Sequence, residues 1–173
     1  MIVSSPAQLK ATDAVVLPGV GNFSEGSRHL GRLKEAILEL VREGIPVLGI
    51  CLGMQLFFQE SEEGKGRGLA LFQGKNVRLP DSVKVPHMGW NTLRIIKQND
   101  ILEGIEDGSY VYFVHSLYPV PIDRDIISAE TTYGVAFASA VAKQNIYGTQ
   151  FHPEKSGELG LRILRNFVKI VRR

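Results

Sequence analysis

The sequence is poor in several features that define large classes of protein. It contains one cysteine among 173 residues, which excludes an internal disulfide framework and a CxxC metal or redox pair. Lysine and arginine (20) barely exceed aspartate and glutamate (18), and a formal charge of +2 gives no electrostatic case for binding nucleic acid or an anionic membrane. The sequence shows no apolar run as long as a membrane span and no signal-peptide pattern in its first ten residues. We therefore expect a cytoplasmic protein.

What the chain does have is the composition of a packed domain. With 44% hydrophobic and 22% charged residues, and without repeats or a linker, residues 1–173 are expected to form a single domain. Residues 14–17 and 47–50 are short apolar runs typical of buried strands, and between them residues 26–43 repeat apolar positions at helical spacing. This βαβ pattern predicts a parallel sheet with helical cover, and a further helix is expected over residues 52–59.

The second half of the chain favours short strands over helices. Strands are expected over residues 76–79, 93–96, 110–114, 126–130, 135–141 and 146–151. A helix with an apolar stripe from Leu161 to Val171 closes the chain. The basic residues on its other faces are interpreted as a solvated surface, with nucleic-acid binding as the weaker alternative. The prediction is an α/β fold whose parallel sheet has an antiparallel extension.

The single cysteine lies at a strand-to-helix junction. Cys51 stands in a GxCxG pattern between Gly49 and Gly53, the thiol counterpart of the GxSxG nucleophile elbow. Glycines allow the sharp turn, and a helix N-terminus favours the thiolate. The pattern indicates a nucleophile, with a buried structural cysteine as the alternative.

A candidate base follows the last predicted strand. Of the four histidines, His29 falls on the polar face of the long helix, and we expect it at the surface. His152 precedes Pro153, which favours an extended backbone, so Glu154 projects to the same side and can hydrogen-bond one ring nitrogen. A simple turn is the alternative. In an α/β sheet, however, both strand ends meet at the carboxyl edge, where such sheets carry their sites.

A glycine-rich turn follows the first predicted strand and reaches the same edge. The segment Pro18-Gly19-Val20-Gly21 can aim backbone N–H groups into a site, and the N–H of Leu52 is a second donor next to the nucleophile. Acyl transfer needs such donors for the developing oxyanion. A plain glycine turn is the alternative.

Together these segments resemble a known family. The stretches PGVG (18–21), GICLGMQ (49–55) and QFHPEKS (150–156) are similar to those of class I, triad-type glutamine amidotransferases. PHMGWN (86–91) and YFVHS (112–116) resemble the glutaminase subunits of imidazole glycerol phosphate synthases. The resemblance extends from about Ile2 to the C-terminus. It implies a flavodoxin-like open parallel sheet with helices on both faces.

The resemblance also implies a reaction. Cys51 would attack the side-chain amide of glutamine, His152 would carry the proton, and Glu154 would orient His152. Ammonia leaves, and water releases glutamate from the glutamyl thioester. The N–H groups of Val20 and Leu52 would form the oxyanion hole once the glycine-flanked peptide reorients.

The resemblance also implies roles for further residues. Those expected to hold glutamine are Gly19, Gly21, Gln55, Glu63, His115, Ser116 and Leu117. Leu117 stands where tyrosine is usual in the family, so this chain has no phenol at that position. We expect neither a metal nor a bound cofactor.

Released ammonia is useful only while it is unprotonated, which argues for a partner that receives it under cover. The resemblance implies a heterodimer with a cyclase subunit, a (β/α)₈ barrel that uses the ammonia in histidine biosynthesis and also releases aminoimidazole carboxamide ribotide. The residues expected to face it are Pro86, His87, Met88, Gly89, Trp90, Asn91 and Lys155. Taken alone, Trp90 would be interpreted as a core aromatic residue.

The beginning of the chain departs from the family. Its members carry a strand, a glycine-rich turn and a helix before the segment that matches Ile2-Val3, and that unit is absent from this sequence. Its absence would leave strand backbone unpaired and a sheet face uncovered. A catalytically impaired binding subunit is therefore one alternative hypothesis. Another is an amidotransferase subunit of a different synthase, against which residues 86–91 argue.

Overall fold

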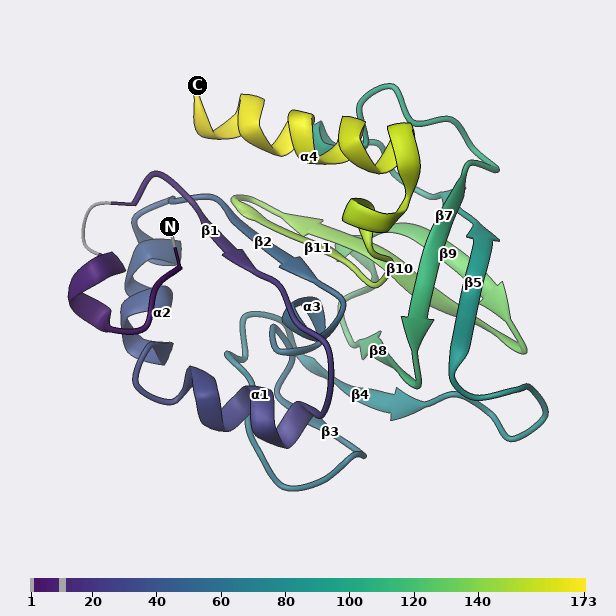
Figure 1. Cartoon of the computed structure of the whole chain (residues 1–173), viewed down its shortest axis with the longest axis horizontal. Coiled ribbons are helices and arrows are strands. Elements are labelled where there is room, and N and C mark those ends of the chain that lie inside the picture. The colour runs from purple at the N-terminus through teal and green to yellow at the C-terminus, as the bar shows by residue number, and fades with distance from the viewer. Residues whose placement is uncertain (1, 10–11) are drawn as a thin grey trace.

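A six-stranded sheet forms the centre of the molecule in the computed structural model, which describes residues 2–9 and 12–173 (Figure 1). Its order is β1-β2-β11-β10-β9-β6. The parallel strands are β1 (Val15–Leu17), β2 (Val47–Ile50) and β11 (Ile146–Thr149). The antiparallel ones are β10 (Val135–Lys143), β9 (Ile127–Tyr133) and β6 (Arg94–Ile95). The predicted parallel sheet with an antiparallel extension is confirmed. Residues 1, 10 and 11 of the predicted domain lie outside the described residues.

Helices cover both faces of this sheet, as predicted. The helices α1 (Phe23–Leu30) and α2 (Lys34–Arg42) lie on one side, and α4 (Gly157–Val171) lies on the other (Figure 1). Buried strand residues alternate between two apolar clusters: Val47 packs with the α1 and α2 side, and Leu48 packs with the α4 side. The period-2 geometry of β2 thus supplies both cores.

The single helix predicted over residues 26–43 is two helices in the structure. The first begins at Phe23, because the Asn22 side chain caps it by accepting from the Ser24 N–H at 2.8 Å, and it ends at Leu30, before the C-cap residue Gly31. Glycine is a poor helix former. Leu30 and Ile37 lie on either side of the break and share one core, so the apolar spacing does not reveal it.

Two small sheets complete the fold. One contains β3 (Glu60–Ser61), β4 (Gly74–Arg78) and β8 (Leu117–Pro121), and the other pairs β5 (His87–Thr92) with β7 (Tyr110–His115). Neither β5 nor β8 was predicted. The two prolines of β8 argue against a strand but are tolerated at its edge position, and β5 has few β-branched residues. Short 3₁₀ helices occupy Pro6–Leu9, Asp100–Leu102, Arg124–Ile126 and Pro153–Lys155.

The helix after β2 is shorter than predicted and packs unusually close to the sheet. It is α3 (Leu52–Gln55), rather than residues 52–59. A Cβ atom on Gly53 would lie 1.7 Å from the Leu17 carbonyl oxygen, and one on Gly49 would lie 2.6 Å from the Phe57 ring. Only glycine at both positions allows α3 to begin directly against β1 and β2.

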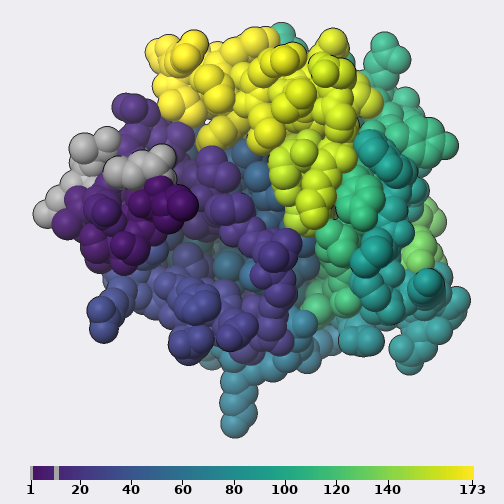
Figure 2. Space-filling model, in the orientation of Figure 1, coloured from purple at the N-terminus to yellow at the C-terminus, as the bar shows by residue number. Residues whose placement is uncertain are grey.

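The strand β1 is an edge strand of the described sheet. A cavity of about 730 Å³ runs beside it, lined mainly by apolar residues that include Val3, Leu9, Val15, Ile37 and Val171. The N-terminal segments and α4, which both contribute to this lining, border one another on the face shown in Figure 2.

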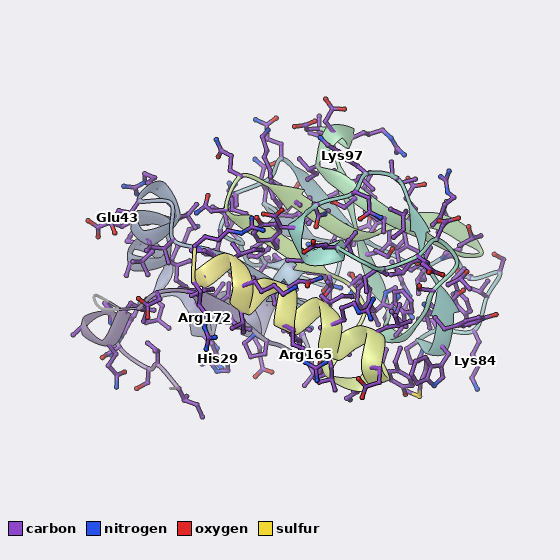
Figure 3. The ribbon with its side chains drawn as sticks, turned by 90° about the horizontal axis from the view of Figure 1, so that it is seen from above. His29, Glu43, Lys84, Lys97, Arg165 and Arg172 are labelled. Atoms are coloured by element: carbon purple, nitrogen blue, oxygen red, sulfur yellow. The ribbon has the colours of Figure 1, made fainter. Side chains whose placement is uncertain are left out.

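Charged side chains gather on the outside of the helices. His29 is exposed, as predicted, and so are Arg165 on α4 and Arg172 directly after that helix (Figure 3). The basic residues of α4 therefore form a solvated face. None of the helices among the described residues is long and apolar enough to cross a membrane.

We predict that Gly53→Ala destabilises the chain by about 3 kcal/mol or more, since the new methyl group overlaps backbone that cannot move away. The measurement is thermal or urea unfolding. Gly44→Ala is the control: its φ of 85° is unfavourable for alanine, at about 1–2 kcal/mol, but nothing described lies within 4 Å of the added Cβ. Equal losses in the two variants would contradict the packing argument.

Candidate active site

Cys51 occupies a strained elbow between β2 and α3. Its φ of 53° and ψ of −107° are rare for a residue other than glycine, and strain of this kind is common at functional sites. Its N–H donates to the Thr149 carbonyl at 2.7 Å, which fastens the elbow to β11. The thiol is buried and lies 3.7 Å from the Val114 carbonyl oxygen. The predicted strand-to-helix turn at this cysteine is confirmed.

The thiol is strongly held in its neutral form. Burial raises the pKa of Cys51 to about 11, and the backbone N–H of Leu52 and the Gln150 amide only partly oppose that rise. Glu154 also raises it through its negative charge. Attack by the sulfur therefore requires a base that takes the proton.

His152 is held in the manner that such a base requires. Its Nδ1 atom lies 2.7 Å from a carboxylate oxygen of Glu154, so the predicted hydrogen bond is present. The imidazole is buried, and among the described residues its Nε2 atom has no hydrogen-bond partner. A carboxylate only accepts, so the proton of the neutral ring is on Nδ1 and the lone pair on Nε2. That lone pair is available to accept a proton.

The predicted oxyanion donors are not assembled in this conformation. The N–H of Leu52 donates to the Gly19 carbonyl oxygen at 3.3 Å, so the Gly19–Val20 peptide presents its oxygen where an oxyanion would need an N–H. A rotation of this peptide would exchange that oxygen for the N–H of Val20. Gly21, which follows with a φ of 109°, provides backbone freedom for the change.

A small cavity of about 180 Å³ opens beside Cys51. It is below the roughly 300–1,000 Å³ of sites for drug-sized ligands, and so suits a small metabolite. The predicted substrate residues that line it are Gly21, Gln55, Glu63, His115, Ser116 and Leu117. Gly19 is not in the lining, whereas Val114 and Pro86, which were not predicted as substrate residues, are.

Sequence reasoning missed Gln150. This buried residue lies with its Nε2 atom 3.6 Å from the Cys51 sulfur. The signal was available, because Gln150 and His152 are separated by two positions at the end of a strand and project to the same side.

The predicted partner-facing residues divide into exposed and buried side chains. Met88 (62% exposed) and Trp90 (56% exposed) lie on the outer face of β5, and the Trp90 ring packs edge-on against Tyr112. The interpretation of Trp90 as a core residue is therefore wrong. His87 is buried and stacked against Tyr133, so its side chain is not part of this face. At least partly exposed are Pro86, Gly89, Asn91 and Lys155.

Comparison with known proteins identifies the class. The model of the family "Glutamine amidotransferase class-I" matches residues 2–171. A crystal structure of a glutamine amidotransferase superposes with a TM-score of 0.76 at 16% identity, covering 99% of this chain and 85% of its own, which shows the common fold. The chain belongs to the class-I glutamine amidotransferases.

The sequence relatives narrow this family to one branch. The chain is 48% identical to the imidazole glycerol phosphate synthase subunit HisH of Methanocaldococcus jannaschii, over 99% of this chain and 87% of that protein. It is 50% identical to the subunit of the same name from Methanothermobacter thermautotrophicus, over 99% of this chain and 86% of that protein. Within the amidotransferases the chain therefore belongs with the HisH subunits.

We predict that Cys51 reacts slowly with iodoacetamide at pH 7, and that the rate rises about tenfold per pH unit up to at least pH 10. A pKa raised to about 11 keeps the thiol protonated over this range, and each unit of pH below the pKa reduces the thiolate fraction tenfold. As the only cysteine, it is also the only thiol measured. The urea-unfolded chain, with an ordinary thiol pKa of about 8.5, is the control. A rate plateau below pH 9 in the folded chain would contradict the prediction.

Proposed function

We propose that this amidotransferase is the glutaminase subunit of an imidazole glycerol phosphate synthase, and that it hydrolyses glutamine with Cys51, His152 and Glu154. The proposal rests above all on one observation: a cysteine in a strained elbow and a histidine already oriented by a carboxylate end neighbouring strands of one sheet. The names of the relatives at about half identity support the particular synthase.

The proposed reaction begins with transfer of the thiol proton to Nε2 of His152. The sulfur then attacks the side-chain amide carbon of glutamine, and the imidazolium returns the proton to the departing nitrogen as the thioester forms. Glu154 stabilises the imidazolium through the hydrogen bond to Nδ1. In the second half His152 takes a proton from water, whose oxygen attacks the thioester carbon. The carbon–sulfur bond then breaks, glutamate leaves, and the imidazolium returns the proton to the sulfur.

The oxyanion formed in each half of the reaction needs hydrogen-bond donors that are not assembled in the present conformation. We assign this role to the N–H groups of Val20 and Leu52 after the Gly19–Val20 peptide has rotated. Until then the Leu52 N–H stays on the Gly19 carbonyl and the thiol stays protonated, so unproductive loss of glutamine is suppressed. The six predicted residues that line the 180 Å³ cavity are assigned to glutamine binding.

We further propose that a cyclase subunit, a (β/α)₈ barrel, docks on the exposed face around Met88 and Trp90 and receives the ammonia. Large exposed apolar side chains of this kind favour a protein interface. The two subunits form a heterodimer in the cytoplasm, where a reduced cysteine is maintained. In this assignment residues 1–173 act as one amidotransferase domain.

We predict that glutamate release from glutamine depends on the cyclase subunit and its nucleotide ligand, and disappears in Cys51→Ala. His152→Ala is expected to lower the rate by about 10²–10⁴-fold, the usual contribution of a positioned base. The exposed His29→Ala is the matched control and retains full activity. If the folded protein released no glutamate under any of these conditions, the result would contradict the proposed function and favour a catalytically impaired subunit.

We also predict that Val20→Pro lowers glutaminase activity by about 10²–10³-fold, because proline has no N–H and so removes one oxyanion donor. The Val20 side chain is exposed, so the substitution does not disturb core packing. Val20→Ala keeps the N–H and is the control, with activity near that of the original chain. The readout is kcat with the partner bound, together with the melting temperature. Equal activity of the two variants would remove Val20 from the oxyanion hole.

A further inference from the structure

Two buried histidines outside the proposed triad face one another across β5 and β7. Nδ1 of His87 lies 3.0 Å from Nε2 of His115, and the two residues are directly paired in the register. Burial lowers the pKa of His87 to about 4 and that of His115 to about 3, so both rings are neutral at pH 7. Each ring then has one N–H and one lone pair, and its surroundings decide which nitrogen carries the proton.

The outer end of this pair is fixed by Asn91. Its side-chain oxygen accepts from the Thr92 N–H at 2.8 Å, and its Nδ2 donates to the Thr132 carbonyl at 3.1 Å. The amide can therefore point only one way, and Nδ2 is the atom that lies 3.3 Å from Nε2 of His87. His87 must accept at Nε2 and carry its proton on Nδ1.

The contacts of His115, at the inner end of the pair, require the same placement of the protons. The proton on Nδ1 of His87 points to Nε2 of His115, which must then carry its own proton on Nδ1. That atom lies 2.8 Å from the Leu117 carbonyl oxygen, which can only accept. The same carbonyl accepts from Nε2 of Gln55 at 2.9 Å.

From Gln55 the chain of hydrogen bonds reaches the sulfur. Nε2 of Gln55 also donates to Oε1 of Gln150 at 3.1 Å, which turns the nitrogen of Gln150 toward the thiol, 3.6 Å away. Both glutamines are buried. The Gln150 amide therefore turns its N–H donor to the sulfur and not its own oxygen. This donor favours the anionic form of the sulfur, whereas the Val114 carbonyl oxygen 3.7 Å away opposes it.

We propose that Gln150 is a further catalytic residue, whose Nε2 proton stabilises the Cys51 thiolate during attack. Asn91, His87 and His115 are positioning residues that hold the Leu117 carbonyl group in place, and this carbonyl and Gln55 set the orientation of the Gln150 amide. This inference rests on the proposed function, because it takes Cys51 as the nucleophile. It requires neither glutamine nor the partner to be tested.

The first test reads the histidine tautomers in the unmodified chain. Long-range ¹H–¹⁵N spectra of protein labelled at the imidazole nitrogens are expected to show His87 and His115 neutral, with the proton on Nδ1, from pH 5 to pH 8. His87→Gln assigns the signals. An Nε2–H tautomer at either residue, or titration of either between pH 5 and pH 8, would overturn the proposal.

The second test measures the pH profile of iodoacetamide alkylation at Cys51. Gln150→Leu keeps the volume but removes the donor, and the rate at pH 8 is expected to fall about tenfold or more, with the profile moved to higher pH. His115→Phe should lower the rate in the same direction. His115→Asn, whose amide can replace the Nδ1 donor to Leu117, should recover most of it.

Tyr133→Phe is the matched control, because it removes a hydrogen bond to the Lys84 carbonyl while keeping the ring stacked on His87. Its alkylation profile is expected to overlay that of the original chain. A merely structural role would lower melting temperatures without moving the profile, so an unmoved profile in folded Gln150→Leu rejects the proposal. If that variant does not fold, the alkylation profiles of His115→Phe and His115→Asn decide. Failure of glutamine hydrolysis alone would instead count against the proposed function.

Discussion

The approach of α3 to the sheet governs the rest of this site. With Gly53 against the Leu17 carbonyl and Gly49 against Phe57, the chain turns from strand to helix within one residue, and that residue is Cys51. The turn places the cysteine at positive φ, a conformation that the surrounding packing must maintain. A side chain larger than hydrogen at Gly53 would separate α3 from β1 and move the thiol away from its neighbours.

The strand order then brings distant parts of the chain to that thiol. Because β2 and β11 are parallel neighbours, with Ile50 paired to Thr149, the residues that follow them emerge side by side at one edge of the sheet. Cys51 follows the first strand, and Gln150 and His152 follow the second. The pair β5 and β7 closes the other side of the cavity, with His115 in its wall.

The polar groups around the sulfur define a resting state. Burial keeps the thiol neutral, and the Leu52 N–H is occupied by the Gly19 carbonyl. The histidine pair has its hydrogen-bonding groups satisfied, as buried polar groups require, whereas Nε2 of His152 has no partner among the described residues. In this resting conformation the site holds a base that can accept a proton and a thiol that has not yet given one up.

The sequence by itself determined the βαβ core, the elbow at Cys51 and the pairing of His152 with Glu154. These follow from local apolar spacing, from glycine and from alternation along an extended segment. The break between α1 and α2, the strands β5 and β8 and the exposure of Trp90 did not follow. Each depends on which element packs against another: Trp90 is exposed because no described element covers the face of β5 that it shares with Met88, and β8 forms despite two prolines because it is an edge strand. A chain of hydrogen bonds leads from Asn91 to Cys51. The donor and acceptor at each of its steps were likewise decided only by tertiary structure, since they depend on carbonyl groups from different strands.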